Sequence, residues 1–172
     1  MGEGSTEPCS GCGLQVPGGA TGCQSIMDTL LALQFSHPAY FAVHRLFVDT
    51  YSMQHPERYC VSFKSLAAHL AHLCWSLECG GSRALPSEGI RRWVERQADS
   101  VKPALPAFRG TVTIDSVART STPAEHHQAV EIWARATWEA YASLHSTARH
   151  WVDLALGGEK RRSTPARLRK IG

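Results

Sequence analysis

Four leucines within residues 62–78 recur at intervals of four, three and four positions, at Leu66, Leu70, Leu73 and Leu77. This spacing returns every side chain to one face of an α-helix, whereas the side chains of a β-strand alternate between two faces. A helix with one continuous apolar face must bury that face against another element. The segment therefore predicts a helix inside a helical core.

Two earlier segments carry signals of the same kind. Residues 23–35 repeat apolar side chains at helical spacing and predict the first helix. Pro38 suits the first position of a second helix over residues 38–54. Pro56 follows, and since a residue before proline avoids the α conformation, this helix should end near His55.

The strongest helix start lies near the end of the chain. Thr122, Pro123 and Glu125 combine a capping box with a proline at the first helical position, and they predict one long helix over residues 123–155. The region before it is less regular. It predicts a short helix over residues 87–97, followed by an extended, proline-punctuated connector.

These elements predict an all-α fold: an up-and-down helical bundle with a zinc-knuckle-like leader and a long C-terminal helix. The chain has 172 residues and is 43% hydrophobic, enough to form one domain with a core. We expect residues 1–22 to form the leader, residues 23–156 the bundle domain and residues 157–172 a basic, flexible tail.

Charge is distributed unevenly along the chain. Residues 157–172 contain six Lys or Arg and one Glu, a net charge of +5, whereas the whole chain carries +3, so the remainder carries −2. The tail suits contact with an acidic surface, but the mildly acidic body argues against a nucleic-acid-binding protein. With neither a run of 18 apolar residues nor a secretory signal, we expect no membrane contact and a cytoplasmic location.

Three cysteines in the leader suggest a metal site. Cys9 and Cys12 form a Cys-x-x-Cys-Gly turn, and Cys23 follows ten residues later. Two intervening residues let both thiolates reach one ion, and zinc is the metal that such sets hold. Two alternatives stay open at this point: incidental cysteines in a disordered leader, and a redox-active cysteine pair, which the lack of a βαβ pattern disfavours.

His55 is the predicted fourth ligand. A short connection between the first two helices makes them antiparallel, so Cys23 and His55 should lie at the same end of the bundle, about 20–25 Å from that connection. The leader is tethered to the same end. Cys9, Cys12, Cys23 and His55 would form a tetrahedral and saturated zinc site, which is structural and not catalytic.

A second polar cluster is predicted inside the bundle. His44 and Tyr51 share one helical face, and His69 should lie at their level on the neighbouring helix. The long helix can bring either His126 or His145 to this place. If three of the histidines met with an open coordination position, they would form a metal-dependent catalytic site. A hydrogen-bonded polar core is the alternative interpretation.

Several segments together resemble a bacterial domain family of unknown function. They cover residues 9–152 and are the CxxCG turn, LLALQFSHPAY, HRLFVDTYSMQHP, SLAAHLAHLC, AEHHQAVEIWARATWEAY and HSTARHW. The resemblance implies a cytoplasmic helical protein and supplies no catalytic residue.

The sequence therefore favours a small helical interaction module with a structural zinc site and leaves its partner unknown. The alternative is a His-ligated, metal-dependent hydrolase or transferase, so whether the protein is an enzyme stays open. Motifs for other hydrolases, such as HExxH and GxSxG, are absent from the sequence.

Overall fold

The protein is almost entirely helical, which confirms the predicted fold class. The computed structural model describes residues 5–79, 86–98 and 100–162. Its strands are β1 (Thr6–Pro8) and β2 (Gln15–Pro17), which pair antiparallel. Its helices are α1 (Gly19–Ser36), α2 (Pro38–Phe41), α3 (His44–Gln54), α4 (Pro56–Tyr59), α5 (Phe63–Cys74), a π-helical turn (Trp75–Cys79), α6 (Ser87–Glu95), α7 (Asp115–Ala118), α8 (Pro123–Ala140), a 3₁₀ turn (Ala142–Leu144) and α9 (His145–Arg162).

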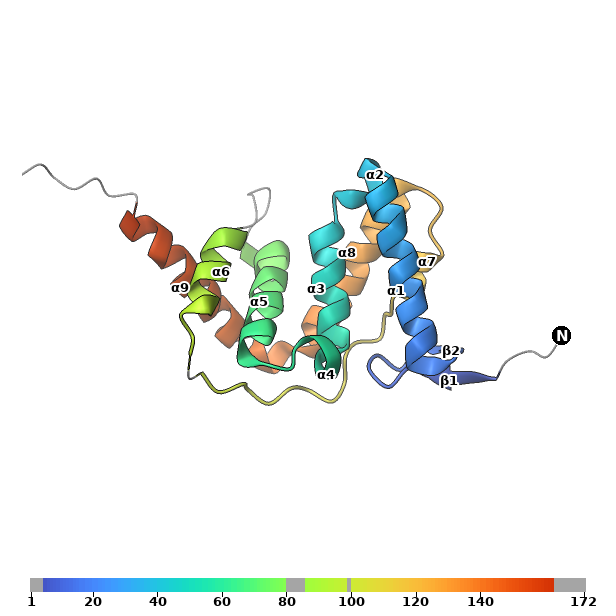
Figure 1. Cartoon of the computed structure of the whole chain (residues 1–172), viewed down its shortest axis with the longest axis horizontal. Helices are drawn as coiled ribbons and strands as arrows, with labels where there is room; N and C mark the ends of the chain where they lie inside the picture. Colours follow the sequence, from blue (N-terminus) through green and yellow to red (C-terminus); the bar gives the residue numbers. More distant parts are fainter. Residues whose placement is uncertain (1–4, 80–85, 99, 163–172) are drawn as a thin grey trace, which may run out of the picture.

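Helices α1, α3, α5 and α6 stand side by side and alternate in direction, while α8 and α9 cross them (Figure 1). The small β1–β2 hairpin lies at the lower end of α1, and α4 follows the lower end of α3. None of the helices within the described residues has the length and apolar character needed to cross a membrane.

The prediction of one long helix over residues 123–155 is wrong in one respect, because the observed helix is interrupted. The α-helix ends at Ala140, and a 3₁₀ turn precedes α9. Tyr141 is fully buried at this break, and its hydroxyl donates a hydrogen bond to the carbonyl of Met53 at 2.6 Å. The change of direction lets α8 pack on α3 while α9 packs on α5 and α6. Tertiary packing thus outweighs a continuous local helical pattern.

Other boundaries also differ from the prediction. The predicted second helix is divided at Ala42 and Val43, which lets α2 contact α8 while α3 packs on α5. Part of the expected tail is helical, since α9 continues through Gly157 to Arg162, and the rest of that prediction lies outside the described residues. Pro56 ends α3 at Gln54, as the sequence predicts.

Two apolar cores follow from the bend between α8 and α9. One core gathers side chains from α5, α6 and α9, together with Met53 and Trp138. The other joins α1, α7 and α8 to the outer side of α3 through Phe47, Tyr51 and Trp133. Helix α3 lies between the two cores, which explains why nearly all of its second half is buried.

Gln54 is the polar link between three parts of the fold. Its side-chain oxygen accepts a hydrogen bond from the Trp133 indole at 2.9 Å. Its side-chain nitrogen donates to the carbonyls of Arg109 and Val112 at 3.0 and 2.8 Å. Gln54 is fully buried, so it is the partner for groups that water cannot reach.

We therefore expect Gln54→Leu to lower the free energy of unfolding by about 2–4 kcal/mol, because it leaves buried donors and acceptors unpaired. Urea unfolding followed by far-UV circular dichroism measures the change. The exposed residue Gln128 gives a matched control, Gln128→Leu, which should change stability by less than about 0.5 kcal/mol. Equal effects of the two substitutions would contradict this role of Gln54.

Candidate metal centre

The leader folds into a hairpin whose turn presents two thiols. Cys9 and Cys12 lie between β1 and β2, where the Cys9 amide donates to the Leu14 carbonyl and the Gly13 amide donates to the Cys9 carbonyl, both at 2.8 Å. Gly13 has a φ of 77°, a left-handed conformation that glycine adopts without steric cost. The glycine-containing turn therefore closes tightly enough to bring both sulfurs to one side.

The other two side chains come from helices that the hairpin contacts. Cys23 lies in the second turn of α1 and is fully buried. His55 follows the last residue of α3, and its backbone leaves the helical conformation before Pro56. The His55 Nδ1 lies 2.8 Å from the carbonyl oxygen of Tyr51. That carbonyl can only accept, so Nδ1 carries the proton and Nε2 keeps its lone pair for the sulfurs.

The structure brings Cys9, Cys12, Cys23 and His55 together, with all four ligand atoms within 4.8 Å of one another. The His55 Nε2 lies 3.4 Å from the Cys9 sulfur and 3.5 Å from the Cys23 sulfur. The sulfurs of Cys12 and Cys23 are 3.7 Å apart. Zinc bond lengths in a tetrahedral site put two sulfurs about 3.8 Å apart and sulfur and nitrogen about 3.6 Å apart. These contacts agree with that geometry, and the Cys₃His group could hold a metal ion.

Contacts between neighbouring thiols in this group shift their pKa values in opposite directions. The hydrogen bond with Cys23 lowers the pKa of the Cys12 thiol, and the same bond, with burial, raises the pKa of the Cys23 thiol. Burial also raises the pKa of Tyr51, so its hydroxyl stays protonated and points to the Cys23 sulfur at 3.8 Å. The Tyr51 ring stacks on the His55 ring with centroids 4.0 Å apart. Tyr51 thus orients and shields two of the four side chains.

A small cavity of about 180 Å³ adjoins this group on the side of Tyr51 and Tyr59. The Tyr59 hydroxyl donates to the side-chain oxygen of Gln24 at 2.6 Å. Of the residues that line it, His55 is a member of the group and Tyr51 contacts it. Within the described residues, the potential ligand atoms gathered at this place are those of the four Cys₃His side chains.

The histidines of the predicted interior cluster do not meet at one place, although Gln34 links His44 to His126. His44 Nδ1 lies 2.9 Å from the side-chain oxygen of buried Gln34, whose nitrogen lies 3.0 Å from His126 Nε2. His145 instead stacks on Trp138, and its Nε2 lies 2.9 Å from that residue's carbonyl oxygen. Among the described residues, the Cys₃His side chains come together as potential metal ligands, and no three of these histidines do.

His69 and Tyr51 also face away from each other. Tyr51 contacts the Cys₃His group, while His69 Nδ1 lies 2.7 Å from a carboxylate oxygen of Asp49. The reason is that α3 buries two faces: one towards α1 and one towards α5. The sequence analysis assumed that this helix buries a single face and therefore expected these residues to meet. In the fold they lie on two different buried faces.

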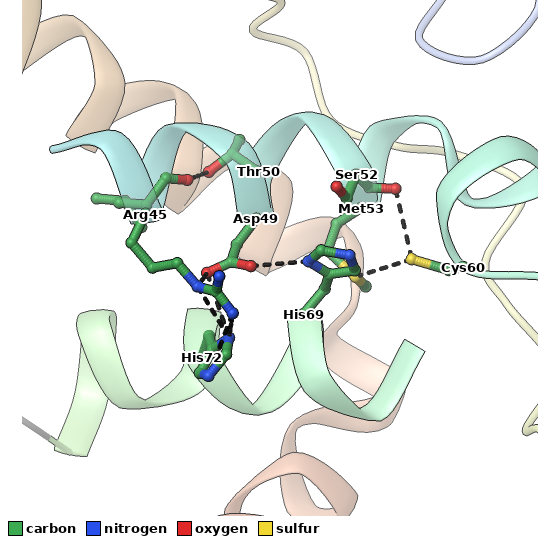
Figure 2. Close-up of polar contacts among 9 residues, drawn as sticks. Arg45, Asp49, Thr50, Ser52, Met53, Cys60, His69 and His72 are labelled. Atoms are coloured by element: carbon green, nitrogen blue, oxygen red, sulfur yellow. Dashed lines mark hydrogen bonds and ion pairs between the residues drawn. The ribbon is translucent and has the colours of Figure 1, made fainter. Parts of the chain in front are cut away.

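Asp49 is the residue that the sequence interpretation missed. Its side chain is 1% exposed and lies between Arg45, His69 and His72 (Figure 2). Burial by itself would raise its pKa, but the hydrogen bond from His69 and the proximity of His72 and Arg45 outweigh this effect and lower the pKa of Asp49. A usable signal was present, since Asp49 shares helical spacing with apolar Leu46.

The first prediction from this site concerns Gly11. A Cβ atom at this position would lie 2.3 Å from Cδ2 of His55, so Gly11→Ala must displace the ring or the turn. We expect the melting temperature to fall, with a destabilisation of about 1–3 kcal/mol. The exposed neighbour gives the control Ser10→Ala, which should melt like the parent protein in calorimetry.

The second prediction concerns acid. Because the pKa of Asp49 is below its ordinary value of 3.8, its ionised form stabilises the folded state above that pH. We expect Asp49→Asn to cost about 2 kcal/mol at pH 7, through the loss of charge-assisted hydrogen bonds. The difference should shrink as the pH falls through the lowered pKa, where the parent carboxylate is also protonated. Urea unfolding at pH 7, 5, 4 and 3 measures this, and a difference independent of pH would contradict it.

Comparisons with known proteins agree with the resemblance seen in the sequence. No curated protein and no solved structure matches the chain significantly. Residues 7–142 match a family described as a family of unknown function, DUF5946. This match includes every residue of the Cys₃His group as well as Asp49, and it extends over more than half of the chain. The protein belongs to the DUF5946 family of unknown function.

Proposed function

We propose that this protein is a small cytoplasmic interaction module whose N-terminal part is stabilised by a structural zinc ion. The observation that supports the proposal is the Cys₃His group, in which four buried or half-buried ligand atoms lie within 4.8 Å of one another. Thiolate-rich tetrahedral sets are the usual ligands of structural zinc. A reducing compartment would keep these cysteines free for the metal.

The zinc ion would join three elements: the β1–β2 hairpin, α1 and the end of α3. The β1–β2 hairpin is short and mostly exposed, and a two-stranded hairpin is marginally stable by itself. Cys9 and Cys12 supply the hairpin's ligands, Cys23 supplies that of α1, and His55 supplies that of α3. Binding would therefore stabilise the docking of the hairpin on both helices. The four ligands leave no open position, which favours a structural role over catalysis.

An exposed aromatic pair supports the role in binding a partner. Phe35 is 68% exposed and Phe41 is 43% exposed, and their ring centroids are 5.5 Å apart. His44 stacks on Phe41 at 4.6 Å and extends this surface. Exposed aromatic groups of this kind are enriched at protein interfaces. The basic residues near the C-terminus would add attraction to an acidic partner.

The enzyme alternative has less support. A catalytic metal site needs about three protein ligands and an open position for water or substrate. His44, His69 and His145 each contact a different partner. We therefore propose no hydrolase or transferase activity for these residues.

Purified protein should contain one zinc ion per chain, and His55→Ala should lose it. We expect this substitution to cost about 3 kcal/mol, a fall of about 6–12 °C in melting temperature. The exposed His150 gives the control His150→Ala, which should keep both the metal and the melting temperature. Inductively coupled plasma analysis and calorimetry measure the two quantities.

Cobalt substitution separates a structural site from a catalytic one. A tetrahedral spectrum typical of three thiolates and one imidazole would agree with the proposal. A five-coordinate spectrum that changes on adding small anions would indicate an open position and overturn the structural assignment. Absence of any stoichiometric metal from protein prepared without chelators would also overturn it.

A further inference from the structure

A second cavity, of about 310 Å³, lies between α3, α5 and α6. Arg45 of α3 and His72 of α5 form one side, and Ser87 and Arg91 of α6 form the other. Apolar side chains complete the wall, contributed by Ala68, Ile90 and Val94. Its volume equals that of about ten water molecules and lies at the lower limit for small-molecule sites. None of the four residues of the Cys₃His group lines it.

The guanidinium of Arg45 is held from behind by buried groups. Its Nε lies 3.1 Å from Oδ2 of Asp49 and donates to Nδ1 of His72, also at 3.1 Å (Figure 2). Asp49 is in turn held by His69 at 2.7 Å. The Nη1 group of Arg45 has no hydrogen-bond partner among the described residues. Arg45 lines the cavity, and this part of its guanidinium is available to a ligand there.

The hydrogen bond from Arg45 also determines which ring nitrogen of neutral His72 carries the proton. Since Nδ1 accepts this bond, the proton of the neutral ring is on Nε2. The His72 side chain is only 4% exposed and lines the cavity, so its ring adds a buried donor there. On the opposite side, Arg91 binds Glu88 and Glu95, which offsets the charge of Glu95 in the cavity wall.

The two members of the Arg45–Asp49 ion pair differ too much in burial for the pair to be an ordinary surface salt bridge. Arg45 is 49% exposed, whereas Asp49 is 1% exposed. An exposed ion pair stabilises a protein by about 0–1 kcal/mol, and moving a carboxylate out of water costs several kcal/mol. In addition, Oδ2 of Asp49 receives no well-directed hydrogen bond, although Arg45 and His72 lie near it. The buried carboxylate also fixes the direction of Arg45.

We propose that the cavity between α3, α5 and α6 binds a small organic oxyanion, a carboxylate or a phosphate ester, through Arg45 and His72. Arg45 presents N–H groups in the planar arrangement that suits carboxylate and phosphate oxygens. The His72 ring donates one further hydrogen bond. Ala68, Ile90 and Val94 contact the apolar part of the ligand. A divalent cation is a poor fit, because Arg45 and Arg91 both line the cavity and its one lining carboxylate, Glu95, is already paired with Arg91.

The binding site can be tested with three probes of similar size: butyrate, methyl phosphate and butyramide, which is the uncharged analogue of butyrate. Two-dimensional ¹H–¹⁵N NMR of the full chain follows each titration. We expect saturable shifts in residues of α5 and α6 with at least one anion below about 10 mM, and none with butyramide. Which anion binds more tightly distinguishes a carboxylate ligand from a phosphate ester.

Substitutions then assign the binding to Arg45. Arg45→Gln should weaken anion binding at least tenfold, and so should Arg45→Lys, which keeps the charge but not the planar pair of donors. Asp49→Asn should weaken it by releasing Arg45. Arg119 forms an exposed ion pair with Asp115 away from the cavity, so Arg119→Gln is the matched control and should bind normally.

Circular dichroism establishes that each variant is folded before its affinity is compared, and Arg45→Lys replaces Arg45→Gln if the latter unfolds. The proposal is overturned if neither anion binds, if butyramide binds as well as butyrate, or if the folded Arg45 variants bind like the parent. The zinc content of the protein is measured separately, so a failure to bind anions would not contradict the proposed metal centre.

Discussion

The structure depends on the burial of α3 from both sides. An ordinary amphipathic helix buries one face and leaves the other in water. Helix α3 instead separates two apolar cores, so its polar side chains are also enclosed. Each enclosed group needs a partner, since an unpaired buried donor or acceptor costs about 1–3 kcal/mol. Gln54, Asp49 and His55 meet this requirement in three different ways, and each way joins α3 to another part of the chain.

His55 shows how local chain geometry prepares the metal centre. Pro56 forces the preceding residue out of the helix, and the freed imidazole turns back to the Tyr51 carbonyl at 2.8 Å. That contact selects the ring nitrogen facing the three sulfurs. A histidine within a continuous helix would point along the helix surface instead. The proline that ends α3 thus also positions the candidate ligand, with Tyr51 fixing its plane by stacking.

Local signals predicted the fold better than they predicted the contacts. Thr122 begins a helix because its hydroxyl caps the first turn, and Pro56 ends one because of a steric clash with its neighbour. Such effects act within a few residues and can be seen in the sequence. The antiparallel arrangement of the first helices also sufficed to expect His55 near the cysteines.

The remaining features depend on distant packing. The break at Tyr141 exists because its hydroxyl reaches the Met53 carbonyl, 88 positions away in the chain. Asp49 escaped notice because an acidic residue on a helix is normally solvated, and only the presence of α5 on its side makes it buried. The predicted meeting of His44 with His69 failed for the same reason, since it assumed one buried face where α3 has two.

The two sites share α3 but make opposite use of burial. At its C-terminal end, the Cys₃His group is closed: its four ligand atoms face one another, and Tyr51 covers them. About 9 Å earlier along the axis, the Asp49 carboxylate is equally buried, yet the group that it holds remains half exposed. Under the proposed function, this group stabilises the fold through the metal ion that it binds. The guanidinium of Arg45, held on its buried side by Asp49, lines a cavity instead, which is the basis for proposing an anion as its partner there.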